Sequence, residues 1–73
     1  MMYSEIQAKI PQVDEILLRV TRSIRAGLDT QPMIDWAEKQ IEKSGDEESR
    51  AAAMVAVRKL AKITEEGRNH DNQ

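Results

Sequence analysis

The chain has 73 residues and a formal net charge of -2, and its aromatic residues are Tyr3 and Trp36 alone. A chain this short forms at most one domain and buries only about 60% of its unfolded surface, so we expect marginal stability unless copies or partners associate. It contains no Cys, and its apolar runs are far shorter than the about 20 residues that span a bilayer. Disulfides, thiolate metal sites and membrane spans are therefore excluded, and a cytoplasmic location is expected.

The first segment has the apolar spacing of a helix that packs on other helices. Its periodic residues are Ile6, Ile10, Val13, Leu17, Val20 and Ile24. Pro11 interrupts this stripe, which allows two interpretations. Either a short turn with a Ser4–Gln7 capping box precedes a helix that begins at Pro11, or one long helix bends there. Because the stripe keeps its phase across Pro11, we favour the continuous or bent helix, ending at Gly27.

The next two segments also carry helix signals. Asp29 or Thr30 can cap a helix from about 31 to 43 or 44, with Pro32 in its first turn and Leu28 and Met33 placed as a hydrophobic staple. Gly45 ends that helix, and Asp46 is the expected cap of a third helix that continues to Gly67.

These signals predict an all-α fold, a small three-helix bundle or helical array with helix one possibly bent at Pro11. Residues 1–67 are expected to form a single helical domain. Residues 68–73 are polar and are expected to be a disordered C-terminal tail.

Trp36 is offset from the apolar face of the second predicted helix. At about 100° per residue, Ile34, Ala37 and Ile41 share one face, and Trp36 lies roughly 130° from its middle. Two interpretations stay open: the ring covers the end of the core, or it belongs to a binding patch of Met33, Trp36 and Gln40. In the second case the partner is another protein or a second copy of the chain, and homo-oligomers are expected.

Catalytic and metal-binding patterns are missing from the sequence. The single histidine, His70, lies near the C-terminus with nothing to fix its geometry as a base. The cluster of Asp46, Glu47 and Glu48 lacks the ligand spacing of a calcium loop, and helix capping explains it better. We therefore expect no enzymatic activity, no metal and no cofactor.

Nucleic-acid binding is the alternative function. Arg19, Arg22 and Arg25 recur at i, i+3 and i+6 along one side of the first predicted helix, as a small DNA-binding transcriptional regulator would require. The third helix, however, begins with acidic residues, which phosphate would repel. The other interpretation is that these arginines are solvated and pair locally, as Glu15 and Arg19 would at i+4.

The joint between the first two predicted helices carries one resemblance. Gly27, followed nine residues later by Trp36 and Ala37 with a capped helix start between them, resembles the small all-helical immunity proteins of bacterial toxin systems. The resemblance implies a stoichiometric inhibitor that covers another protein's surface, and it implies no site residues. We expect a small interaction protein of bacterial or phage type, with a regulatory, inhibitory or assembly role.

Overall fold

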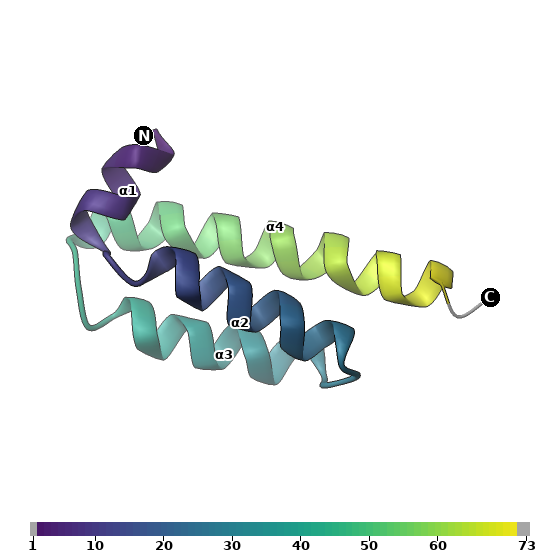
Figure 1. The fold of residues 1–73 in the computed structure, drawn as a ribbon. Helices are drawn as coiled ribbons and strands as arrows, with labels where there is room; N and C mark the ends of the chain where they lie inside the picture. The colour runs from purple at the N-terminus through teal and green to yellow at the C-terminus, as the bar shows by residue number, and fades with distance from the viewer. Residues whose placement is uncertain (1, 72–73) are drawn as a thin grey trace.

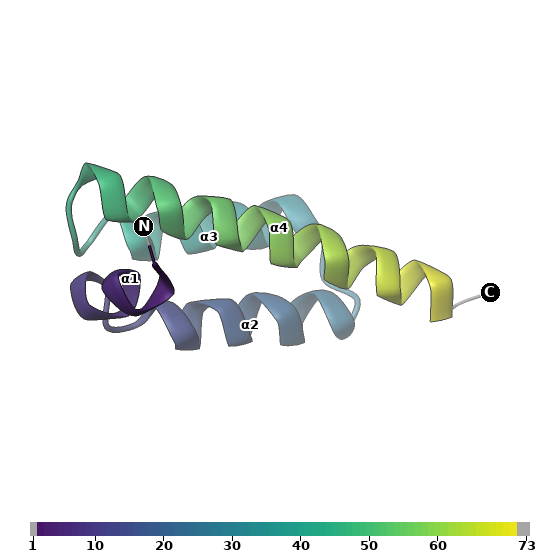
Figure 2. The same cartoon turned by 90° about the horizontal axis from the view of Figure 1, so that it is seen from above.

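The computed structural model describes residues 2–71 and folds them into four helices. These helices are α1 (Tyr3–Lys9), α2 (Val13–Arg25), α3 (Thr30–Ile41) and α4 (Glu47–Asp71). The long helices α2, α3 and α4 pack along one axis, and α1 crosses steeply over one end of the bundle (Figures 1 and 2). No strand occurs within residues 2–71, which confirms the all-α prediction.

The predicted first helix is two helices, because the chain leaves helical geometry at Ile10. This residue has φ -126° and ψ 82°, the extended type of conformation that a residue before proline adopts. The continuous or bent helix that the stripe favoured is therefore wrong, and the three-helix count becomes four. Ile6 and Ile10 are still buried, because α1 packs on both α4 and α2.

Polar contacts to α2 replace the predicted Ser4–Gln7 capping box. The N-cap of α1 is Met2, and no side chain caps it. Gln7 Nε2 instead donates to Asp14 Oδ2 at 2.9 Å, and the Tyr3 hydroxyl donates to the same carboxylate. Partial burial and the Asp14 carboxylate raise the pKa of Tyr3 to about 12. These bonds help to fix the steep angle between α1 and α2.

Gly27 ends α2 as predicted, with φ +102°, whereas Gly45, with φ +74°, lies beyond the end of α3 at Ile41, in the turn before α4. At Gly27 the Leu28 N–H donates to Ser23 O and the Gly27 N–H donates to Ile24 O, each at 3.0 Å. This pair of bonds is the Schellman motif, which satisfies carbonyls at the end of α2. The chain thereby reverses direction and brings α3 alongside α2 (Figure 1).

Asp46 caps α4, as predicted. Its Oδ1 accepts the Ser49 N–H at 2.8 Å, and Ser49 Oγ accepts the Asp46 N–H at 2.9 Å. This reciprocal pair has the geometry of a capping box, with Ser49 in the position usually held by Glu or Gln. The Lys9 ammonium also contacts the Asp46 carboxylate at 2.9 Å and so ties α1 to the start of α4.

Two helix ends differ from the predictions. α3 ends at Ile41, two residues before the earlier of the expected ends, with Glu42 as its C-cap. α4 does not end at Gly67 but continues to Asp71, so residues 68–71 are helical, and residues 72 and 73 lie outside the described residues. Arg68 Nη1 donates to Ile24 O at 2.8 Å and Leu28 O at 3.1 Å. These bonds hold the last turns of α4 against the joint between α2 and α3.

The core lies where α2, α3 and α4 meet and extends under α1. Its buried apolar residues are Ile6, Ile10, Val13, Ile16, Val20, Ile24, Ala37, Ile41, Ala53, Met54, Val57 and Ala61. The predicted stripe is confirmed except that Ile16 is buried and Leu17 only half-buried. Within residues 2–71 we find no helix that combines the length and the apolar character of a membrane span.

Candidate interaction site

Trp36 lies on the flank of α3 that faces α2. Ala37 and Ile41, on the core side of α3, are 0% and 1% exposed, whereas Trp36 and Gln40 are half-buried. Part of the indole packs against the core. The remaining part reaches the surface, so Trp36 takes part in both the core and the protein surface.

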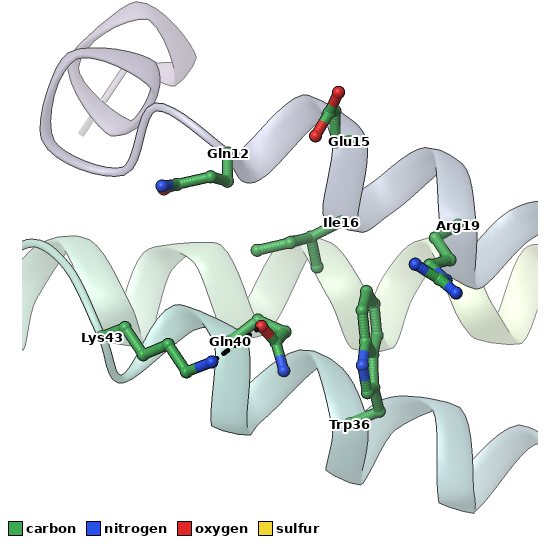
Figure 3. Close-up of a pocket in the computed structure, with 7 residues that line it drawn as sticks. All are labelled: Gln12, Glu15, Ile16, Arg19, Trp36, Gln40 and Lys43. Carbon is green, nitrogen blue, oxygen red and sulfur yellow. Dashed lines mark hydrogen bonds between the residues drawn. The ribbon is translucent and has the colours of Figure 1, made fainter.

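A surface hollow of about 360 Å³ separates α2 from α3 beside this ring (Figure 3). The α2 side contributes Gln12, Glu15, Ile16 and Arg19, and the α3 side contributes Trp36, Gln40 and Lys43. Ile16 extends into the hollow from α2, and Trp36 closes one end. The hollow thus has an apolar floor and a mostly polar rim.

Arg19 covers part of the Trp36 ring. Its Cζ lies 5.3 Å from the ring centroid (Figure 3), a distance at which the cation is attracted to the face of the indole. The predicted Glu15–Arg19 ion pair is wrong: in the described part of the chain the ion pairs are Lys9–Asp46 and Arg58–Glu38. Arg19 prefers the indole because the helix turns it toward α3, while Glu15 lies on the upper edge of α2 in Figure 3.

The rim of the hollow is rich in hydrogen-bond donors. Lys43 Nζ donates to Gln40 Oε1 at 3.3 Å, which leaves the amide nitrogen of Gln40 directed elsewhere. The Trp36 indole N–H has no hydrogen-bond partner among the described residues. Together with the Arg19 guanidinium, these groups suit a ligand surface that presents acceptors next to an apolar group.

The predicted patch of Met33, Trp36 and Gln40 is brought together in part. Trp36 and Gln40 both line the hollow, whereas Met33 is half-buried against the core and does not line it. Gln12, Ile16 and Lys43 also line the hollow, although the sequence did not point to them as members of the patch. Their spacing could have indicated this position. Residues 12, 16 and 19 share one face of their segment, and residues 36, 40 and 43 share one face of the next, so the two faces can meet when the segments are antiparallel.

The three arginines of the alternative function are brought together only in part. Arg19 and Arg22 line one depression on the outer surface of α2, together with Glu15, Leu18 and Ser23, and the Arg19 guanidinium also covers part of the Trp36 ring. Arg25 is exposed in the last turn of α2. Only Arg22 and Arg25 are therefore directed to solvent without a contact to the indole.

Within the described residues there is no group of three or more His, Cys, Asp or Glu side chains that could hold a metal ion. The side chain of His70 lies outside the described residues. The Asp46 carboxylate is occupied, because it accepts the Ser49 N–H and contacts the Lys9 ammonium. These contacts hold the pKa of its carboxyl well below the usual range. The acidic cluster is thus explained by the start of α4.

Comparison of the chain with known protein families, curated proteins and solved structures finds no match.

Proposed function

We propose that this chain is a small non-enzymatic interaction protein of the cytoplasm, of bacterial or phage type, that binds another protein or a second copy of itself. The observation that supports this function is the position of Trp36, half-buried at the rim of a surface hollow rather than enclosed in the core. Trp is the residue type most enriched where truncation costs binding energy. The proposed binding residues are Met33, Trp36 and Gln40, of which Trp36 and Gln40 line the hollow.

The hollow supplies both parts of such a contact. The exposed part of the indole offers apolar area, and Arg19, Gln40 and Lys43 offer donors around it, next to the Glu15 carboxylate. A partner helix or loop that inserts an apolar side chain beside an acceptor would satisfy both. Inhibition, regulation and assembly are all compatible with binding of this kind.

The test is site-specific cross-linking followed by binding measurements. A photoreactive residue in place of Gln40 should capture the partner in a lysate of the source cells, and the same residue in place of Glu66 serves as the control. The captured partner should then bind Trp36→Leu about thirtyfold more weakly or worse, since hot-spot truncations cost about 2 kcal/mol or more. Leu keeps apolar packing on the core, so the helix content by circular dichroism should be unchanged.

The matched control is Leu28→Ala, which removes a side chain that is 54% exposed and does not line the hollow. Its affinity for the captured partner should equal that of the wild type. If the partner binds Trp36→Leu as tightly as the wild type, Trp36 is a core residue and the proposed binding surface is wrong.

A small DNA-binding regulator stays the second candidate, because neither Arg22 nor Arg25 takes part in an ion pair within residues 2–71. Phosphate contacts would make the affinity fall steeply as salt rises. Fluorescence anisotropy of a labelled duplex across salt concentrations distinguishes this candidate, and absence of binding at low salt would remove it.

A further inference from the structure

A second hollow, of about 460 Å³, lies between α3 and α4. Its floor is apolar and includes Ile41, Met54 and Val55, of which Val55 is 64% exposed. Its rim carries the carboxylates of Glu38, Glu42 and Glu47. We call this surface the acidic hollow.

The two arginines of the acidic hollow are already engaged. Arg50 donates to Ser44 O and to Gly45 O, each at 2.8 Å, in the turn before α4. Arg58 lies 3.9 Å from Glu38, the longer of the two ion pairs in the described part of the chain. Glu42 and Glu47 have no ion-pair partner within residues 2–71. With three glutamates and two arginines in its lining, the hollow carries a net negative charge, and the exposed part of its apolar surface includes Val55.

The opposite side of the molecule has the complementary composition. Leu18, which is 48% exposed, lies beside Arg22 in the depression on α2, and Arg25 follows one turn later. We call these three residues the basic face. Asp14 and Glu15 lie in the first turn of α2. Glu15 also lines the depression, where Arg19 and Arg22 outnumber it, so the net charge of this surface is positive.

Helix geometry sets these two surfaces on opposite sides of the bundle. The core side of α2 is defined by Ile16, Val20 and Ile24, and at about 100° per residue Leu18 and Arg22 point roughly the other way. α3 and α4 both pack on the core side of α2 (Figures 1 and 2). The groove between them therefore faces away from the basic face.

We propose that copies of this chain associate head to tail, with the basic face of one copy docked in the acidic hollow of the next. Leu18 contacts the hollow at the exposed Val55. The arginines pair with Glu42 and with Glu38, whose 3.9 Å contact with Arg58 is exchanged for the new one. The spacings of the two charged pairs along their helices are similar. Arg22 and Arg25 are three positions apart, a rise of about 4.5 Å, and Glu38 and Glu42 are four positions apart, a rise of about 6 Å. Such a contact joins two different surfaces, so it builds rings or filaments rather than a two-fold dimer.

A second copy is the occupant that fits both surfaces. Nucleic acid could use the basic face, but its phosphates would leave the acidic hollow without a partner. The neighbouring chain supplies an apolar side chain and cations to the hollow, and carboxylates to the basic face. This contact does not use Met33, Trp36 or Gln40, so it is independent of the proposed partner site.

The experiment uses two variants that each disable one surface, studied by sedimentation velocity at low salt. Arg22→Gln with Arg25→Gln neutralises the basic face, and Glu38→Lys with Glu42→Lys reverses the charge of the acidic hollow. The wild type should form species larger than a dimer as its concentration rises, and higher salt should dissociate them. Each double variant alone should associate at least about tenfold more weakly. The two glutamines remove the attraction to the acidic hollow, and the two lysines repel the arginines of the basic face.

An equimolar mixture of the two variants is the decisive sample. The intact basic face of the hollow variant should dock into the intact hollow of the other, giving a one-to-one dimer and nothing larger. A variant that failed to fold could not form this dimer, so the mixture also controls for folding. Trp36→Leu should associate like the wild type, which keeps this test separate from that of the proposed function.

Three results would overturn the proposal. The first is a wild type that stays monomeric at low salt up to its solubility limit. The second is a mixture that contains no dimer although the wild type associates. The third is association that Trp36→Leu abolishes and both double variants retain, which would assign the contact to the Trp36 surface.

Discussion

Trp36 belongs both to the core and to the protein surface. One part of the ring packs on the core, and the other lies under Arg19 at the edge of the hollow between α2 and α3. A cation over an indole is worth about 0.5–1 kcal/mol at an exposed position, so Arg19 holds the ring in place without enclosing it. A partner that approaches the hollow would meet a ring whose orientation is already fixed, and fixing the ring in advance lowers the entropic cost of binding.

Asp46 makes the stability of the protein depend on pH. The Ser49 N–H and the Lys9 ammonium favour its ionised form and so lower its pKa from the usual value of 3.8. A lowered pKa contributes stability that is fully present above 3.8 and is lost as the pH falls toward the folded value. We predict that the urea midpoint falls below pH 4 in the wild type, and that Asp46→Asn is less stable near neutral pH and loses much of this pH dependence.

Asp14→Asn is the matched control, since Asp14 also accepts side-chain hydrogen bonds but caps no helix. It should keep the acid dependence that Asp46 causes. An acid dependence in Asp46→Asn as steep as that of the wild type would mean that other carboxylates dominate the acid unfolding.

At the scale of the elements, α1 is short, but together with its C-cap Ile10 it contributes large side chains to the core. Ile10 is 0% exposed and Ile6 is 5% exposed, although α1 has only seven residues. We predict that Ile10→Ala lowers the free energy of unfolding by about 2–5 kcal/mol, because it leaves a cavity between α1 and the bundle. Chemical denaturation followed by circular dichroism measures this loss.

Leu18→Ala is the comparison for Ile10→Ala, because it truncates an exposed side chain of similar size. Its effect on stability should stay within about 0.5 kcal/mol, as for most surface substitutions. Equal losses in the two variants would show that α1 is detached from the bundle in solution.

Features set by neighbouring residues could be predicted from the sequence, and features set by contacts between helices could not. The Asp46 cap, the Gly27 helix end and most of the buried stripe depend on residues within a turn or two, and these predictions are confirmed. The break at Pro11 was misjudged because the stripe keeps its phase on both helices, whose apolar sides reach the same core from different directions. Gln7 was assigned to a local cap, yet Asp14 on the next helix is its partner.

The candidate site shows the same division. The offset of Trp36 from the apolar face followed from helix geometry, but its neighbour Arg19 comes from a helix whose rotation about its axis the sequence does not specify. The end of α4 was misjudged for a similar reason. Gly67 is a frequent helix terminator, but the bonds from Arg68 to carbonyls of Ile24 and Leu28 hold the following turn in place.

At the scale of the whole molecule, α4 is the helix on which the other three pack. α1, α2 and α3 each pack on it, and α2 and α3 also pack on each other. Polar contacts hold both ends: Lys9 with Asp46 at one, and Arg68 with the α2–α3 joint at the other. No helix can leave without exposing core residues of α4, so unfolding should be a single cooperative transition.

Gly67 provides the test of this cooperativity. It lies inside α4, and an added Cβ would have no neighbouring atom within 4 Å. Gly67→Ala should therefore stabilise the protein by about 0.5–1 kcal/mol, because Ala loses less conformational freedom in a helix. A change of about 1 kcal/mol raises the Tm of a domain of this size by about 4–8 °C. If the molecule unfolds as one unit, Trp36 fluorescence and far-ultraviolet circular dichroism should report the same increase, although Trp36 belongs to α3. A higher Tm by circular dichroism alone would show that the end of α4 unfolds independently of the bundle.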